Sequence, residues 1–150
     1  MDGAELVEAT DDLGRASSTQ LGGPVWVLRH LDRGDQEPVE VEVTLEFDGD
    51  GGISGLGGCN EYEGKVTDAD GRQLGFAVRS TTARRCPADM TGTESEFSRR
   101  FDAVERFAFQ NGRLLLEYTI DGEAGSLVFD RRPRRASAPK FLMSNLPIGQ

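Results

Sequence analysis

The chain has 150 residues and a formal net charge of −9 at pH 7. A chain of this length forms one domain and can bury enough apolar surface to fold without a metal ion or a disulfide. Residues 131–150 carry five basic residues and no acid, so residues 1–130 carry a net charge of −14. This acidic body should repel nucleic acid and anionic membranes, and nucleic acid is therefore an unlikely partner.

The sequence divides into an acidic leader (1–20), a domain (21–130) and a tail that is first basic and then apolar (131–150). The leader has few large apolar side chains, which is typical of a disordered segment. It also lacks the basic start and apolar centre of a signal peptide, and no apolar run is long enough to span a membrane. We expect a soluble monomer, either cytoplasmic or extracytoplasmic with its signal removed.

Strand patterns begin at Val25 and continue almost to the tail. Residues 25–31 form the first predicted strand, which carries the only tryptophan, Trp26. Residues 39–47 alternate strictly between apolar and polar side chains, which predicts a strand with one face in the core. A glycine-rich turn at 48–52 leads into a return strand at 53–56. Further strands are predicted at 61–67, 74–80, 107–109, 114–118 and 127–129.

One helix interrupts these strands. Thr93-Glu94-Ser95-Glu96 matches a capping box, and Phe97, Phe101 and Val104 follow at helical spacing. About eight short antiparallel strands with one helix between the fifth and sixth predict a mainly β (α+β) fold. One helix cannot cover so much sheet, so we expect the sheet to curl on itself with the helix packed in or across it. The predicted core comprises Trp26, Val41, Val43, Leu45, Phe47, Phe76, Phe97, Phe101, Leu116 and Phe129.

Cys59, Cys86 and His30 are the residues with reactive side chains. The two cysteines can form a disulfide, a redox pair or two buried thiols, and we expect their Cα atoms about 4.4–6.8 Å apart. A bridge closing about 28 residues stabilises a fold by roughly 3–4 kcal/mol in the chain-entropy model. The only histidine, His30, alternates with Trp26 and Leu28, as expected of a partly buried strand residue. The sequence has no C-x-x-C motif, and one histidine with two cysteines is a poor zinc site. We expect no catalytic residue, metal or cofactor.

The order of several motifs resembles the META domain, the HslJ-like family of heat-inducible bacterial proteins. The residues that carry the resemblance are Trp26, Gly58-Cys59-Asn60, Thr82 and Cys86, with Leu45-x-Phe47-Asp48 and Gly125-x-Leu127-x-Phe129 toward the two ends. The resemblance implies a small antiparallel half-barrel with a helix, frequent export or lipid anchoring, an association with stress, and no established enzyme activity. Some members resemble pilot proteins that hold a lipid or peptide in a cracked barrel.

The tail contains an apolar cluster that a disordered segment seldom carries, formed by Phe141, Leu142, Met143 and Leu146. We expect one of these side chains to pack on the body or to bind a partner. The function predicted from the sequence is a non-enzymatic, stress-related or envelope-associated protein that binds a hydrophobic peptide, lipid or protein. Two alternatives remain: a small hydrolase or redox enzyme using Cys59 and His30, and a structural assembly protein that acts through its tail.

Overall fold

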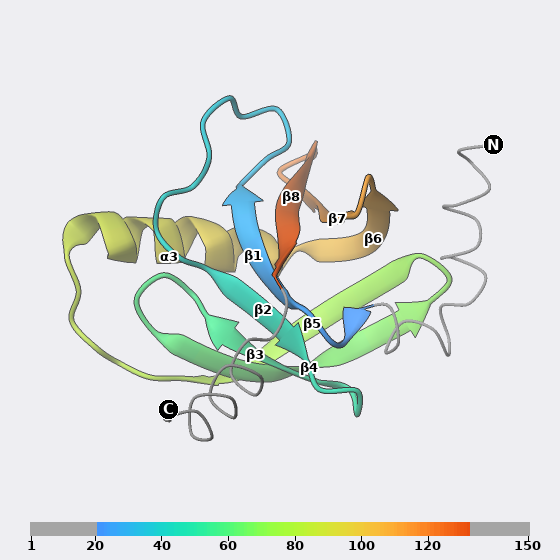
Figure 1. Cartoon of the computed structure of the whole chain (residues 1–150), viewed down its shortest axis with the longest axis horizontal. Helices are drawn as coiled ribbons and strands as arrows, with labels where there is room; N and C mark the ends of the chain where they lie inside the picture. The colour runs from blue at the N-terminus through green and yellow to red at the C-terminus, as the bar shows by residue number, and fades with distance from the viewer. Residues whose placement is uncertain (1–20, 133–150) are drawn as a thin grey trace, which may run out of the picture.

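The computed structural model describes residues 21–132, which form eight strands and one helix (Figure 1). The elements are β1 (Val25–His30), β2 (Thr44–Phe47), β3 (Gly52–Leu56), β4 (Glu61–Asp70), β5 (Gln73–Thr81), α3 (Ala88–Phe101), β6 (Val104–Gln110), β7 (Arg113–Ile120) and β8 (Glu123–Arg132). The strand count and the position of the helix between the fifth and sixth strands are as the sequence predicts.

The eight strands form a closed antiparallel barrel in chain order. The expected half-barrel is therefore wrong, because β1 pairs with β2 on one side and with β8 on the other. Closure is weakest between β5 and β6, where Gln73 and Arg106 are the registered pair. The intervening helix occupies the chain between these two strands, so they are joined by a long connection instead of a hairpin. The barrel is closed, with one thin seam.

Helix α3 completes the core from one end of the barrel. Phe97 and Phe101 of the helix are buried, and the Phe101 ring stacks on Phe76 of β5 with centroids 4.4 Å apart. The Tyr62 ring of β4 packs against both helix rings, with its centroid 5.9 Å from that of Phe97 and 5.7 Å from that of Phe101. These contacts confirm the helix face predicted from Phe97 and Phe101, whereas Val104, expected on the same face, is the first residue of β6 because the helix ends at Phe101. In Figure 1, α3 lies at the left of the barrel, and the β4–β5 turn lies at the right.

The strand expected at 39–47 is regular only over its last four residues. Val39 N–H donates to the Arg29 carbonyl (2.7 Å) and Leu28 N–H to the Val43 carbonyl (2.9 Å), so residues 39–43 follow β1 without forming a continuous ladder. Val41 is only half-buried in this irregular stretch, which corrects its assignment to the core. The other nine residues of the predicted core are buried.

The helix begins at Ala88, five residues before the predicted capping box, with Pro87 as its N-cap. Residues 88–91, expected in a loop, are therefore helical. Glu96 does not cap the helix but pairs with Arg99 and Arg100 on the next turn. The capping-box pattern also fits the interior of an amphipathic helix, and Pro87 followed by an acid in the first turn is the better start signal.

The hairpin turns follow the chemistry of their residues. Asn111 and Gly112 have φ values of 54° and 81°, as do Asp121 and Gly122 at the next hairpin. Two consecutive positive φ values are the mark of a type I′ turn, in which asparagine or aspartate followed by glycine is favoured. Both turns therefore set the register of β6, β7 and β8 locally.

Candidate functional site

The motif that carries the family resemblance, Gly58-Cys59-Asn60 with Thr82 and Cys86, joins the barrel to α3 in a junction that we call the latch. The Glu94 carboxylate, on the helix, accepts the Asn60 backbone N–H at 2.9 Å and the Asn60 side-chain amide at 3.1 Å. The Asn60 side-chain oxygen in turn accepts the Arg84 N–H (2.6 Å) and the Thr82 hydroxyl (3.0 Å). Asn60 thus joins the β3–β4 turn, the segment after β5 and the helix.

The two neighbours of Asn60 in the motif reinforce the same junction. Gly58 has a φ of 116°, and a Cβ there would lie 3.1 Å from the Met90 carbonyl and 3.3 Å from the Glu94 nitrogen. Only glycine lets the turn approach the helix backbone this closely. Cys59 forms a disulfide with Cys86, and their Cα atoms are 6.0 Å apart, within the range expected for a bridge. The bridge ties the turn to the residue before the N-cap of α3.

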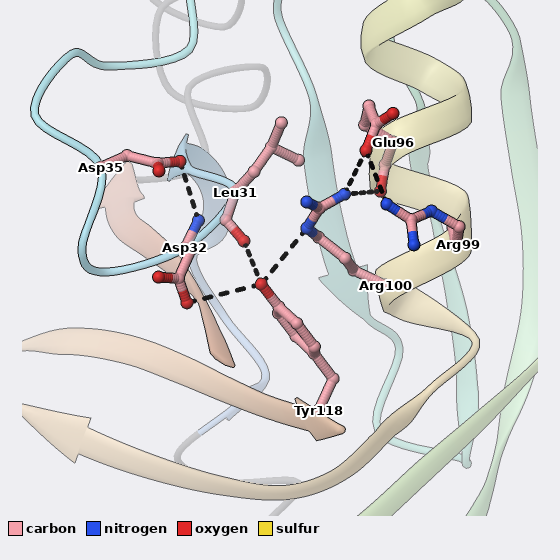
Figure 2. A network of polar contacts seen from close by, with 7 residues as sticks. All are labelled: Leu31, Asp32, Asp35, Glu96, Arg99, Arg100 and Tyr118. Carbon is pink, nitrogen blue, oxygen red and sulfur yellow. Dashed lines mark hydrogen bonds and ion pairs between the residues drawn. The ribbon is translucent and has the colours of Figure 1, made fainter. Parts of the chain in front are cut away.

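A second polar network joins the C-terminal end of α3 to the β1–β2 loop (Figure 2). The Tyr118 hydroxyl donates to the Leu31 carbonyl at 2.9 Å, lies 3.4 Å from Asp32, and accepts the Arg100 Nε–H at 3.2 Å. Arg100 also pairs with Glu96, one turn earlier on the helix. The network therefore connects β7, α3 and the loop through one phenol oxygen.

This network shifts the pKa values of its members in ways that fit a fixed structure. Burial raises the pKa of Tyr118, so its hydroxyl stays protonated and able to donate. Burial also acts to raise the pKa of Asp32, but the backbone N–H groups of Ser126 and Gly34 outweigh it and leave that pKa below its ordinary value. A Cβ at Gly125 would overlap both the Tyr118 hydroxyl and the Asp32 carboxylate. The arrangement holds a loop in place and presents no activated nucleophile.

An apolar pocket lies at the opposite end of the barrel from α3, an end we call the mouth. The pocket has a volume of about 120 Å³ and is lined by Leu21, Phe47, Gly49, Gly51, Gly52, Val66, Ala69 and Leu74. Its walls come from the residues before β1, the β2–β3 turn and the β4–β5 hairpin. The turn at the other end of β3 holds Asn60 and the latch, so the pocket and the helix occupy opposite ends of the barrel. Leu21 also accepts a hydrogen bond from the Trp26 indole at 2.8 Å, which fixes this wall to the core.

Four exposed aspartates lie in the two chain segments that form walls of this pocket. Asp48 and Asp50 lie in the β2–β3 turn, and Asp68 and Asp70 lie at the end of β4, before the β4–β5 turn; all four are exposed. None of them makes an ion pair within residues 21–132. The mouth is therefore an apolar depression with an anionic rim, in which the four aspartates outnumber the two basic residues of the same segments, Lys65 and Arg72.

The remaining candidate residues from the sequence analysis do not form a site in the described structure. Cys59 is in the disulfide and carries no thiol, and the His30 ring lies 3.2 Å from the Glu37 carbonyl. The Cys59–His30 pair needed by the enzymatic alternative is therefore not available in this structure. Phe141, Leu142, Met143 and Leu146 lie outside the described residues. Over residues 21–132 no cluster of histidine, cysteine or acidic side chains is suited to hold a metal ion, and no helix there is long and apolar enough to cross a membrane.

The sequence matches the META domain over residues 19–133, which is most of the chain and all of the barrel. The chain belongs to the META domain family. No curated protein matches it. Among solved structures, its fold is similar to that of a protein from Burkholderia xenovorans determined by NMR (24% identity, TM-score 0.58, covering 81% of this chain and 90% of that one). A DUF4847 family protein from Bacteroides vulgatus is also similar (14% identity, TM-score 0.59, 79% and 99% coverage).

Within this META domain, the motif Gly58-Cys59-Asn60 with Thr82 and Cys86 has a structural role in holding α3 against the barrel. Sequence reasoning missed Glu94, which completes the latch, because it stood inside the supposed capping box. It also missed the mouth pocket, whose residues are 53 positions apart at the extremes, from Leu21 to Leu74. The aspartate-glycine turns were visible in the sequence, but only the closed barrel brings them together.

Proposed function

We propose that this META domain is a non-catalytic binding protein that holds one hydrophobic side chain of a peptide or protein partner in the mouth pocket. The pocket carries the proposal, because concave and mostly apolar sites are where a small hydrophobic group usually binds. The resemblance to the stress-related and envelope-associated members supports a role in that setting, by analogy.

The size of the pocket favours a side chain over a long acyl chain. A cavity of about 150 Å³ lined by apolar residues accommodates benzene, and the mouth pocket of about 120 Å³ is slightly smaller. A phenyl or branched aliphatic group therefore fits, whereas most of a lipid tail would stay in water. The aspartates of the rim favour basic residues next to the inserted group.

The test uses the full chain and a fluorescein-labelled peptide with the sequence Arg-Arg-Phe-Leu-Met-Ser. We expect saturable binding by fluorescence anisotropy that is lost in Ala69→Phe, where the new ring fills the pocket. Ala124→Phe is the matched control, because Ala124 is also exposed but lines a polar cleft at the far end of β8.

Two results would contradict the proposal. Equal binding by the wild type and Ala69→Phe would place the peptide elsewhere. Binding of dodecanoic acid, blocked by Ala69→Phe, without any binding of the peptide would assign the pocket to a lipid.

A further inference from the structure

The mouth is where the described chain both enters and leaves the barrel. Val25, at the start of β1, is registered with Arg132, at the end of β8. Leu21, four residues before Val25, lines the pocket. The segment after Arg132 therefore begins at the same end of the barrel as the pocket, and Figure 1 shows the start of β1 and the end of β8 close together.

The apolar cluster of that segment is within reach. Phe141 is nine residues beyond Arg132, and nine extended residues span up to about 30 Å. This reach exceeds the few strand spacings between β8 and the β4–β5 hairpin, since neighbouring strands lie about 4.8 Å apart. Phe141, Leu142 and Met143 are also of the size that the pocket accepts.

Charge distinguishes this segment from the one that precedes the barrel. Residues 133–150 contain three basic residues and no acid, whereas residues 1–20 contain five acids and one arginine. The four aspartates of the rim attract the first segment and repel the second, over a range of about 8–10 Å at ordinary ionic strength. Lys140 directly precedes the apolar cluster, and Arg134 and Arg135 lie seven and six positions before Phe141, so these basic residues would lie near the rim when the cluster is inserted.

We infer that residues 133–150 supply the resident occupant of the mouth pocket, with a side chain of Phe141–Met143 inserted and the basic residues over the aspartate rim. This inference rests on the proposed function, because it makes the segment an internal competitor of the external partner. A tether of this length supplies an effective concentration of about 1 mM, and a cluster with an intrinsic Kd of about 0.1 mM would then weaken external binding about tenfold.

The experiment measures binding of Nile red, a neutral probe that the anionic rim does not repel, and uses full-length chains throughout. We expect the triple variant Phe141→Ser/Leu142→Ser/Met143→Ser to bind the dye about tenfold more tightly than the wild type. The matched control is Leu6→Ser/Val7→Ser, which removes the apolar side chains of the preceding segment and should leave binding unchanged. Dye binding should be lost when Ala69→Phe is added to the triple variant.

Hydrogen exchange provides a second readout that does not depend on any external ligand. The amides of residues 141–143 should exchange slowly in the wild type and at the rate of an unfolded peptide in Ala69→Phe. Slow exchange in both chains would place the cluster elsewhere, and fast exchange in the wild type would overturn the inference.

The two proposals fail in different ways. Equal dye binding by the wild type and the triple variant, removed in both by Ala69→Phe, would overturn the internal occupant and keep the pocket as a binding site. Slow exchange at 141–143 that is lost in Ala69→Phe, with no dye or peptide bound by any chain, would keep the internal occupant and overturn the external ligand. Tighter dye binding in Leu6→Ser/Val7→Ser would make the preceding segment the occupant.

Discussion

Glu94 of α3 accepts two hydrogen bonds from Asn60, one from its backbone and one from its side chain. Both groups lie in a junction that is half-buried, where an unpaired donor costs more than it would in water. These two hydrogen bonds give the asparagine of the motif a structural role and require no catalytic one.

The latch predicts a specific loss of stability for Glu94→Gln. The amide of glutamine turns a donor toward one of the two donors of Asn60, so we expect the free energy of unfolding to fall by about 1–3 kcal/mol. Glu96→Gln is the control on the same helix, since the Glu96 side chain is 48% exposed and its pairs with Arg99 and Arg100 should contribute under about 1 kcal/mol. Urea denaturation at pH 7 measures both, and equal losses would remove the special role of Glu94.

The aromatic cluster predicts a large effect at the helix. Phe101 is 1% exposed and packs on Phe76, Tyr62 and Phe97. Phe101→Ala should therefore cost roughly 3–5 kcal/mol in chemical denaturation. Val78→Ala serves as the comparison, because Val78 is exposed and its truncation should cost under about 1 kcal/mol. A loss under about 1 kcal/mol at Phe101 would show that the helix face contributes little to the core.

The disulfide predicts sensitivity to reductant. Cys59 and Cys86 are 27 positions apart, and the chain-entropy model gives roughly 3–4 kcal/mol for a loop of this size. Denaturation with and without a thiol reductant should differ by about that amount in the wild type. The double variant Cys59→Ala/Cys86→Ala should show no difference, and a wild type that is equally stable in both conditions would contradict the prediction.

Two glycine substitutions should change the stability of the protein in opposite directions. Gly125→Ala places a methyl group against Tyr118 and Asp32 and should disrupt their network, at a cost of about 1–3 kcal/mol. Gly92→Ala lies on α3 with open space around it and should stabilise the protein by about 0.5–1 kcal/mol. Thermal denaturation at neutral pH distinguishes the two, and a neutral Gly125→Ala would show that the β1–β2 loop moves aside without cost.

Low pH should reduce the free energy of unfolding through protonation of Asp130. Burial acts to raise the pKa of Asp130, but hydrogen bonds from Arg113 (2.7 Å) and Arg29 (3.0 Å) outweigh it and hold that pKa below its ordinary value of 3.8. A lowered pKa means that the unfolded chain binds the proton more readily, so this contribution is full above about pH 4 and is lost as the pH falls through the folded value.

The comparison is between the wild type and Asp130→Asn. The variant should be less stable at pH 6, and the difference should disappear toward pH 2.5, as followed by urea denaturation across that range. Asp121→Asn is the control, because Asp121 sits in a type I′ turn that asparagine fits and makes no ion pair in the described barrel. A difference that persists undiminished at low pH would mean that charge does not underlie it.

Local patterns in the sequence determined most of the elements. The phenylalanine spacing fixed the buried face of α3, and Asn111-Gly112 fixed a hairpin, because both depend on residues a few positions apart. The same patterns failed where a signal was ambiguous. Alternation at 39–43 did not produce a ladder, and the capping box at Thr93 did not begin the helix, because hydrogen bonds to Arg29 and the position of Pro87 decided those boundaries.

Sequence alone thus determined an antiparallel β domain with one helix and membership of the META domain family, and it left the state of the two cysteines open. Tertiary structure decided that the sheet closes, because closure depends on β1 pairing with β8 across about a hundred residues. It also decided that Glu94 completes the latch and that Leu21, Phe47 and Leu74 share one pocket. Those contacts depend on long-range burial, which no local pattern of side chains encodes.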